Sequence, residues 1–568
     1  MWTERLYNTG LSANLAENGV LNVIAQILAG RDNGISGKDD IGAYAAKKLG
    51  SMASPRATAG MEKAAKVVRE TVKNGGNNVA VFGDYDVDGI TSSRICSQML
   101  IEAGFKKVSV YIPNRIDDGY GLNDTSIDNF FTKMELHGFT PDLVMVLDCG
   151  TSSDKQVRGI KERWKNVPVV VVDHHIVDEK EFSASADVVV NPRLNDSHPF
   201  CTAGLMYQFA RELLKKEFIH EKYAAHAAIG TIADVCFMQG SNRTLAHHGL
   251  NALKTTTDIG LSALLSSANI NRDKIDEGTV GFNLAPALNA SGRLSDPMLS
   301  YGLLASKDTS EAQDMARRLI VLNNKRKEMQ QEIIGEIESR IGKEIGSRKS
   351  IVAIGKWHVG IVGIVAGHLA EKYRVPVLCF GIDENGKCTG SGRTKTGINI
   401  KKAMDGCSEI FVKYGGHEMA AGATLNKNYA EKAWDLFDAS VRRLLAENTG
   451  KGVEGVTYDV QLSLTQFRNI NMAFCEKLNM IGPFGSGNEK PIFLVEGVKC
   501  KSVYEWKSGK GGQLSLAEND MEAYAMVPEL AKKVYGKRID ILFSIERSFK
   551  DDVIWALRII HARTSKDI

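Results

Sequence analysis

Short continuous runs of hydrophobic residues dominate the chain between residues 76 and 175. The segments NNVAVFGD, DLVMVLD and VPVVVVD are rich in valine and leucine, and helix-like stretches separate them. Strands that alternate with helices and are apolar on both faces are typical of a parallel sheet covered by helices. The pattern therefore predicts an α/β fold with a parallel-sheet domain over residues 76–300, after a helical region over residues 1–75.

The pattern changes to helical spacing over residues 301–347, and no proline interrupts the stretch from residue 309 to residue 346. Apolar residues on one face of a helix recur at steps of three, four or seven. The residues that follow this spacing are Met315, Leu319, Leu322, Met329, Ile333, Ile337 and Ile341. We therefore expect a long helix that connects two domains.

Residues 452–568 have a third pattern. Short alternating stretches such as TYDVQLSL, GQLSLAEN and RIDILFSIERSF are separated by turn residues. Five or so such strands with an entry helix predict an OB-like β-barrel. One segment of it is interpreted as a track for a nucleic-acid strand, unless its aromatic residues belong to the core and its lysines only keep the protein soluble. The residues of this segment are Lys499, Lys501, Tyr504, Trp506, Lys507 and Lys510.

Composition limits the class of protein. The chain has 568 residues, 43% hydrophobic and 24% charged, which favours three or four domains of an ordinary globular protein. It has no apolar run of about 18 residues and no secretory pattern, and its nine cysteines are scattered singly, so we expect a cytoplasmic protein with no membrane partner. The net charge of +3 is nearly neutral, so a nucleic acid would have to bind local basic patches.

Each of the three apolar runs ends on an aspartate. These residues are Asp84, Asp148 and Asp173. In open α/β sheets the ligand crevice lies at the carboxyl ends of the strands. A single aspartate after a strand is commonly a turn former or a helix cap. Three of them, each followed by further polar residues, predict one shared site at this edge of the sheet.

The segment VFGDYDVDGITSSRI carries the first group of ligands. Asp84, Asp86 and Asp88 alternate, which in an extended chain would place all three carboxylates on one side. Thr91 and Ser92 would then cap the helix that follows. Carboxylates that face one way repel each other unless a cation lies between them. An EF-hand calcium loop is the alternative, but its downstream glutamate and spacing are absent.

Two histidines and a fourth aspartate add further candidate ligands. His174 and His175 follow Asp173 at the strand end, where one imidazole can bind a metal while the other faces the substrate or a supporting carboxylate. Asp234 lies inside an apolar, helix-like stretch, where a buried charge needs a partner or a metal. Arg243 is the alternative explanation, as a salt-bridge partner of Asp234.

Together these segments resemble the DHH phosphoesterase superfamily, and within it the RecJ exonucleases. IPNRIDDGYGLN (112–123), NLAPALNASGRLSDP (283–297) and IGPFGSGNEKPIF (481–493) carry the same resemblance in the same order. The segments KWHVGIVGIVAGHLAEKY (356–373), GSGRT (390–394) and YGGHEMAAG (414–422) are similar to the companion DHHA1 domain. The resemblance implies a DHH catalytic domain, the connecting helix, an α/β DHHA1 domain over residues 348–445, and the OB-like barrel.

The resemblance also implies two divalent cations, Mn²⁺ or Mg²⁺, and carboxylates with one imidazole suit these ions. Asp148 is expected to bridge them, and the full set of implied ligands is Asp86, Asp88, Asp148, His174 and Asp234. The resemblance further implies that His175 and Arg293 lie at the reacting phosphate. It implies that Asp84 and Asp173 lie behind the ligands and orient them.

Residues on the substrate side are also implied by the resemblance. Ser391 and Arg393 lie in a glycine-rich segment and are expected to bind the terminal phosphate, with Arg115 on its other side. A fixed distance from this phosphate to the metals would make the enzyme an exonuclease. The implied substrate-binding residues are Arg115, Tyr120, Asn289, Ser391, Arg393 and His417.

The implied function is cleavage of single-stranded DNA from the 5′ end into 5′-mononucleotides, in repair and recombination, by a monomer that works with a helicase and a single-strand-binding protein. Two alternatives are a phosphodiesterase of short oligoribonucleotides or cyclic dinucleotides, and a non-catalytic single-strand-binding replication factor. The additional barrel and long helix argue against the first. The unbroken acidic motifs argue against the second. An inorganic pyrophosphatase would not need the last domain.

Overall fold

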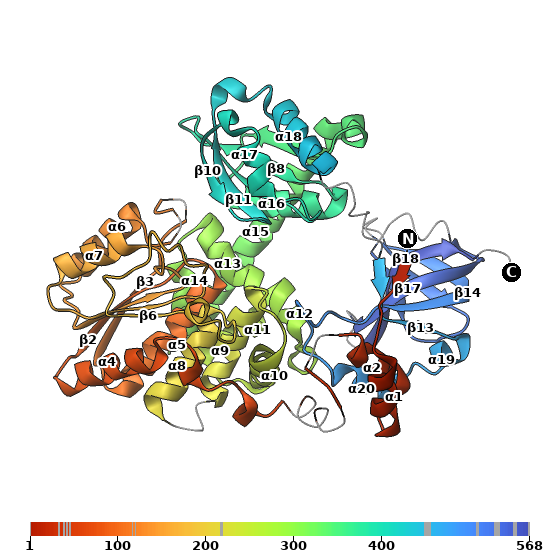
Figure 1. Cartoon of the computed structure of the whole chain (residues 1–568), viewed down its shortest axis with the longest axis horizontal. Helices are drawn as coiled ribbons and strands as arrows, with labels where there is room; N and C mark the ends of the chain where they lie inside the picture. Colours follow the sequence, from red (N-terminus) through yellow and green to blue (C-terminus); the bar gives the residue numbers. More distant parts are fainter. Residues whose placement is uncertain are drawn as a thin grey trace.

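The computed structural model describes residues 2–31, 34–37, 40, 44, 47–115, 117–119, 121–215, 220–447, 456–506, 511–526, 534–548 and 554–565. A parallel sheet, a mixed sheet and a β-barrel form three separate parts of the molecule, and one long helix joins the first two parts (Figure 1). This arrangement confirms the predicted α/β class with a long connecting helix and a C-terminal barrel.

The parallel sheet has the strand order β3-β2-β4-β5-β6, and all its strand pairs are parallel. Its strands are β2 (Asn78–Phe82), β3 (Lys107–Tyr111), β4 (Leu143–Leu147), β5 (Val169–Val172) and β6 (Val188–Val190). Side chains of β4 alternate between two cores, because successive residues of a strand point to opposite faces. Leu143, Met145 and Leu147 enter one core, while Val144 and Val146 enter the other.

Helices cover both faces of this sheet. Helices α6 (Asp124–Leu136) and α7 (Asp154–Arg163) pack on one face through Phe130 and Val157. The opposite core contains residues of α4 (Met61–Lys73), α5 (Val87–Ala103), α8 (Thr202–Leu214) and α9 (His220–Ala233). The same core continues into α10 (Gly240–Thr255), α11 (Ile259–Ser267), α13 (Ala285–Leu294) and α14 (Met298–Ala305).

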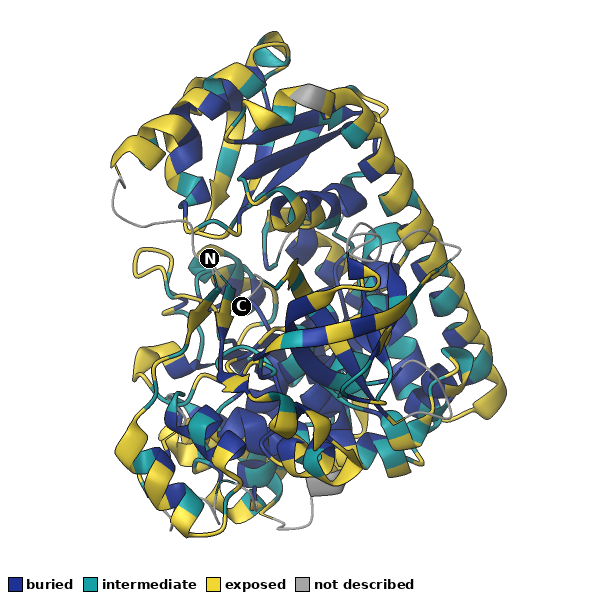
Figure 2. Cartoon of the chain, turned by 90° about the vertical axis from the view of Figure 1, so that its right-hand side faces the viewer, coloured by how far each residue is buried: buried dark blue, intermediate teal, exposed yellow. Residues whose placement is uncertain are grey.

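The predicted connecting helix is α15 (Thr309–Ile341), whose 33 residues begin after the capping residue Asp308. Its first half contributes Leu319 to the core of the parallel-sheet domain. Its second half contributes Ile333 and Ile337 to the core of the next domain. The opposite side of the long helix carries a row of exposed residues (Figure 2). One amphipathic helix is therefore shared by two cores.

The second sheet has the order β10-β11-β9-β8-β7 and is mixed, since only β7 and β8 run parallel. Its strands are β7 (Ile351–Gly355), β8 (Val377–Ile382), β9 (Cys388–Arg393), β10 (Phe411–Gly416) and β11 (Ala420–Leu425). Helices α16 (Val359–Tyr373), α17 (Ile400–Asp405) and α18 (Ala433–Glu447) contribute to its two cores.

The last sheet closes into the predicted barrel, because β14 pairs with both β15 and β17. Its strands are β13 (Val460–Leu462), β14 (Phe493–Glu505), β15 (Gly512–Leu516), β16 (Ala523–Ala525), β17 (Arg538–Arg547) and β18 (Trp555–Thr564). Helices α19 (Leu464–Arg468) and α20 (Met472–Asn479) precede β14.

The first residues of the chain pack against this barrel and not against the parallel sheet. Helices α1 (Thr9–Glu17) and α2 (Asn22–Ala29) contribute Leu15 and Ile27 to the barrel core. Strand β1 (Trp2–Glu4), which the helical pattern did not predict, pairs with β12 (Val456–Tyr458). Among the residues that the structure describes, every helix is too short or too polar to span a bilayer.

Candidate metal centre

The three strand ends converge at one edge of the parallel sheet. Asp84 follows β2, Asp148 follows β4 and Asp173 follows β5, and these three strands are neighbours. All three carboxylates are buried. Asp148 has a positive φ of 64°, a conformation that aspartate tolerates better than most residues. The structure therefore brings together the aspartates that the sequence places after separate strands.

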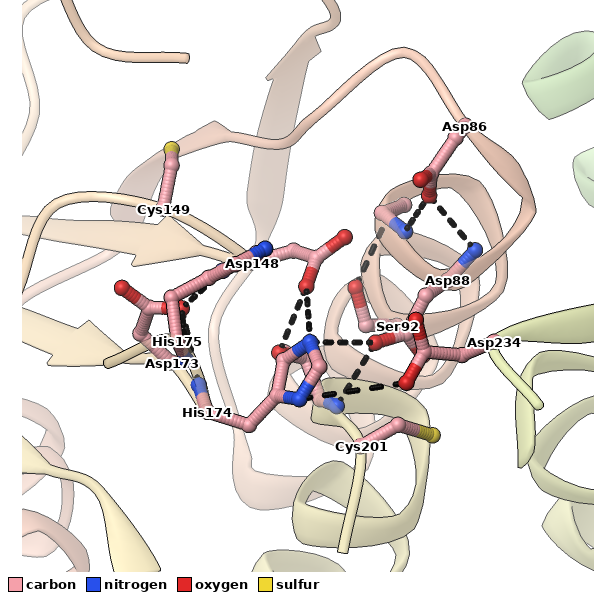
Figure 3. Close-up of polar contacts among 12 residues, drawn as sticks. Asp86, Asp88, Ser92, Asp148, Cys149, Asp173, His174, His175, Cys201 and Asp234 are labelled. Carbon is pink, nitrogen blue, oxygen red and sulfur yellow. Dashed lines mark hydrogen bonds and ion pairs between the residues drawn. The ribbon is translucent and has the colours of Figure 1, made fainter. Parts of the chain in front are cut away.

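His174 lies at the centre of the acidic cluster (Figure 3). Its Nε2 is 3.4 Å from Asp148 Oδ1 and 3.7 Å from Asp88 Oδ2. Its Nδ1 is 3.8 Å from Asp234 Oδ2. One imidazole thus contacts carboxylates from β4, α5 and the end of α9, which lie far apart in the sequence.

Three overlapping groups of donor atoms among the described residues have the spacing of a metal site, since the atoms of each group lie within 4.8 Å of one another. The first is Asp88, His174 and Asp234, the second is Asp148, His174 and His175, and the third is Asp84, Asp86 and Asp148. His174 and Asp148 each belong to two of these groups. This overlap is what two neighbouring cations with a shared ligand require.

The electrostatics of the cluster also favour cations. Burial, together with the charges of Asp88 and Asp86, raises the pKa of Asp148 well above its usual value. Burial and the neighbouring Asp86 raise the pKa of Asp84 to about 8, and burial with Asp88 raises that of Asp234 to about 6. Oδ1 of Asp84 is buried without a hydrogen-bond partner. A divalent cation would offset this repulsion, so the donor set fits Mn²⁺ or Mg²⁺.

Asp173 plays a different structural part from the other aspartates. Its Oδ1 accepts hydrogen bonds from His174 N and from His175 Nδ1, at 2.7 and 2.8 Å, and its Oδ2 accepts one from Thr151 N at 3.0 Å. Burial raises the pKa of Asp173, but the hydrogen bond from His175 and the nearby histidine charges outweigh it, and the net pKa lies below its usual range. One oxygen of the carboxylate therefore holds the two histidines, and the other holds the backbone at Thr151.

His175 is exposed at the edge of the site. Its hydrogen bond to Asp173 raises the pKa of the imidazole to about 9, against the effect of burial. The hydrogen bond to Asp173 holds the imidazole beside the acidic cluster. The backbone carbonyl of His175 accepts a 3.0 Å hydrogen bond from Asn191 Nδ2, a supporting contact that the sequence did not indicate.

The extended conformation predicted for Asp84, Asp86 and Asp88 is wrong at Asp88, because Asp86 is still extended but α5 begins at the next residue. Asp86 is the N-cap of α5, and its Oδ1 accepts hydrogen bonds from Asp88 N and Gly89 N at 2.9 and 3.2 Å. Asp88 is therefore already helical. The predicted capping by Thr91 and Ser92 is wrong too, because both hydroxyls donate to helix carbonyls instead. An aspartate that caps a helix gains two hydrogen bonds that an extended segment would not offer.

Asp234 lies immediately after α9 and not inside a helix, which corrects the prediction. Cys236 Sγ donates a 3.4 Å hydrogen bond to Asp234 Oδ2. Arg243, the alternative partner, instead donates to the carbonyls of Tyr44 and Ile481. The salt-bridge explanation for Asp234 is therefore wrong, and its carboxylate faces His174.

The predicted substrate residues come from both α/β domains. The Arg115 guanidinium lies 5.5 Å from the centre of the Tyr85 ring, next to the acidic segment. Asn289 and Arg293 are on α13, and Arg293 Nη1 donates to Gly360 O of α16 at 3.2 Å. Tyr120 lies outside the described residues. Arg293 therefore links the parallel-sheet domain to the start of the second domain.

Ser391 and Arg393 share β9, and Arg393 Nη1 donates to Ser391 Oγ at 2.6 Å. Both side chains face α16 at Gly363, where an added Cβ would lie 3.3 Å from Ser391 Oγ and 3.5 Å from Arg393 Nη2. The glycine thus leaves room beside a hydroxyl and a guanidinium. His417 is exposed between β10 and β11.

Comparison with known proteins decides the family. Residues 78–231 match the N-terminal domain of the DHH family, residues 347–446 match the DHHA1 domain and residues 458–560 match the RecJ OB domain. This chain belongs to the RecJ group of the DHH/DHHA1 family. The three matched segments correspond to the parallel sheet, the mixed sheet and the barrel.

The similar proteins agree with this assignment. The single-stranded-DNA-specific exonuclease RecJ of Bacillus subtilis is 31% identical over 455 residues, 78% of this chain, and the match spans only 55% of that protein's length. RecJ of Escherichia coli is 29% identical, with 76% of this chain and 77% of that protein covered.

Solved RecJ structures share the fold. The RecJ–Mn²⁺ structure from Thermus thermophilus superposes with a TM-score of 0.80 at 24% identity, covering all of this chain and 80% of that one. A second manganese-bound RecJ structure has a TM-score of 0.59 at 27% identity, covering 69% of this chain and 97% of that one.

Proposed function

We propose that this chain is a metal-dependent exonuclease that degrades single-stranded DNA from the 5′ end and releases 5′-mononucleotides in repair and recombination. The observation that carries the proposal is the position of His174 between Asp88, Asp148 and Asp234, at distances of 3.4–3.8 Å. The named RecJ relatives, which are single-stranded-DNA-specific exonucleases, support it.

The residues that would hold two cations are Asp86, Asp88, Asp148, His174 and Asp234. Asp148 would serve both, a role supported by its membership of two of the three donor groups. Bound Mn²⁺ or Mg²⁺ would supply an activated water and offset negative charge on the phosphate. Asp173 orients the histidines, and Asp84 contributes to the negative potential behind the ligands.

His175 and Arg293 are proposed to act on the substrate. Protonated His175 would donate a hydrogen bond to a phosphate oxygen next to the scissile bond, since its Nδ1 is already committed to Asp173 and its Nε2 remains for the substrate. Arg293 would bind the same phosphate from the domain junction, where its position beside Gly360 holds it.

We assign the restriction of cleavage to the end of the strand to the mixed-sheet domain. Ser391 and Arg393 form a hydroxyl–guanidinium pair that would bind the 5′-phosphate, and Arg115 would bind it from the parallel-sheet domain. Tyr120, Asn289 and His417 would contact the nucleotides behind it. A phosphate held at a fixed distance from the cations permits cleavage only near the end.

The test is digestion of single- and double-stranded DNA and RNA, labelled at either end, with and without Mn²⁺. Release of labelled 5′-mononucleotide from 5′-labelled single-stranded DNA as the first product is expected, and EDTA stops it. Preference for di- to tetraribonucleotides over longer DNA would establish the short-oligonucleotide phosphodiesterase instead. Binding of single strands without cleavage under any divalent metal would establish the non-catalytic alternative.

A further inference from the structure

Thr202 connects two carboxylates of the metal centre that come from different elements. Its Oγ1 donates a 2.9 Å hydrogen bond to Asp148 Oδ1, and its backbone N–H donates a 2.7 Å hydrogen bond to Asp88 Oδ2. The residue is the first of α8 and is fully buried. It is neither a metal ligand in the proposed set nor a member of the acidic motifs.

The two carboxylates depend on Thr202 in different ways. Asp88 Oδ1 also accepts a 2.8 Å hydrogen bond from Ala203 N, so both of its oxygens are held by backbone groups that a side-chain substitution leaves in place. Asp148 Oδ1 is held by the Thr202 hydroxyl, which a single substitution removes. The same oxygen lies 3.4 Å from His174 Nε2. The hydroxyl therefore acts on the carboxylate that two cation sites would share.

We propose that Thr202 is a positioning residue of the metal centre, whose hydroxyl holds the Asp148 carboxylate toward His174 and so increases the affinity for divalent cations. The proposal rests on the proposed function only in naming Asp148 as a ligand. A hydrogen bond to a ligating carboxylate fixes its rotamer and selects which lone pairs face the cation.

Repulsion explains why the carboxylate needs this support. Asp148 lies among buried like charges, with Asp88, Asp86 and Asp84 close enough to act on it. Without a donor, its side chain would lower this repulsion by turning away from the cluster, and a cation would have to restore the geometry on binding. The hydroxyl prevents that rotation before the cation arrives.

Substitution by valine removes the hydroxyl while keeping the branched shape, and serine keeps the hydroxyl. Thr231→Val is the matched control, because Thr231 is also fully buried beside α8 but its hydroxyl contacts Cys201 Sγ, at 3.7 Å, and not a carboxylate. Mn²⁺ affinity is measured on the full chain without DNA, by electron paramagnetic resonance of free Mn²⁺. The far-UV circular dichroism of each variant reports its folding.

We expect Thr202→Val to weaken Mn²⁺ binding roughly tenfold to a hundredfold, in the range seen for lost partners of metal ligands. Thr202→Ser and Thr231→Val should stay close to the parent protein. In DNA digestion, Thr202→Val should lose rate at low Mn²⁺ and regain it at saturating Mn²⁺, with KM for DNA unchanged. If the valine variant does not fold, Thr202→Ala takes its place in the same measurements.

Parent-like Mn²⁺ affinity in Thr202→Val overturns the proposal. Equal weakening in Thr202→Ser also overturns it, because packing and not the hydroxyl would then be responsible. The proposed function is tested separately. A parent protein that binds Mn²⁺ but does not cut single-stranded DNA would contradict the exonuclease. The Mn²⁺ titrations of the variants would still decide whether Thr202 supports cation binding.

Discussion

His174 Nε2 lies 3.4 Å from Asp148 Oδ1, and this pair joins the end of β5 to the end of β4 at the centre of the acidic cluster. Asp148 is buried among like charges, and the half-buried His174 faces three carboxylates. The pair is therefore where loss of a ligand should be most damaging.

Asp148→Asn should remove one negative charge from this pair while keeping the size of the side chain. Because the cations would each supply several kcal/mol of charge stabilisation, the rate of DNA cleavage should fall by about a thousandfold or more. Binding of single-stranded DNA, measured by fluorescence anisotropy, should persist. A variant that retains more than a tenth of the parent rate would contradict the proposed ligand role of Asp148.

Arg393→Ala should reveal whether the second domain reads the 5′ end. Loss of a charge-assisted hydrogen bond of roughly 1.5–3 kcal/mol would slow cleavage of a 5′-phosphorylated strand by about tenfold to a hundredfold. Cleavage of the 5′-hydroxyl strand should change little, so the preference between the two substrates should shrink. Equal cleavage of both substrates by the parent protein would remove this role from Arg393 and Ser391 alike.

Asp118 should control the loop that carries Arg115. Its buried carboxylate accepts hydrogen bonds from Tyr111 Oη, Asn114 N and Asn129 Nδ2, at 2.7, 2.7 and 2.6 Å. Asp118→Ala removes the acceptor oxygens of all three hydrogen bonds, so Arg115 should be held less firmly. KM for DNA should then rise roughly tenfold, while kcat changes less.

The neighbouring Asp117 is the matched control, because it is exposed and carries the same charge. Asp117→Ala should leave KM near the parent value in the same steady-state assay. A similar rise of KM in both variants would mean that the acidic charge of the loop matters, and not the hydrogen bonds of Asp118.

The strand ends of the metal centre were predictable because Val-rich buried strands are the clearest pattern in the sequence, and parallel strands bring their carboxyl ends to one edge. The helical conformation of Asp88 was not, because Asp86 caps the helix that begins directly after it, regardless of the period of its neighbours. Thr202 was not predictable either, since its hydroxyl meets a carboxylate 54 residues away. Such contacts depend on how helices pack on the sheet.

His226 should make the stability of the parallel-sheet domain depend on pH. The side chain is buried on α9, and both of its ring nitrogens are without a hydrogen-bond partner. Burial lowers the pKa of His226 to about 4, with smaller effects of Asp258 and Arg94. The unfolded chain, with the ordinary pKa of about 6.5, binds a proton at a pH where the folded chain does not. Stability therefore falls as the pH is lowered from about 6.5 to about 4.

The expected loss between about pH 7 and about pH 5 is roughly 2 kcal/mol for this group. His226→Leu cannot take up the proton, so its loss over the same interval should be smaller by about that amount. Urea unfolding of both proteins at the two pH values, followed by circular dichroism, gives the comparison. Parallel pH dependence of the two proteins would show that His226 is already protonated in the folded state.

The barrel should bind the strand beyond the active site through β14. Tyr504 is 63% exposed on this strand, and Lys499 and Lys501 are exposed on it as well. Trp506 is only half-buried, with its ring centre 6.3 Å from that of Tyr524. Lys507 and Lys510 lie outside the described residues. Because the Tyr504 ring is exposed on the same strand as Lys499 and Lys501, we favour stacking on bases and binding of phosphates over a place in the barrel core.

Two substitutions separate these contributions. Lys501→Ala should weaken binding of a long single strand and lower the slope of log affinity against log salt by about 0.7, the value for one lost phosphate contact. Tyr504→Ala should weaken binding by roughly 1–3 kcal/mol without changing the slope, because stacking releases no counterions. Lys63→Ala, an exposed lysine on α4, is the control and should change neither quantity. Fluorescence anisotropy titrations at several salt concentrations measure the affinity and its salt slope. Unchanged affinity in Lys501→Ala and Tyr504→Ala would mean that the exposed β14 residues only keep the protein soluble.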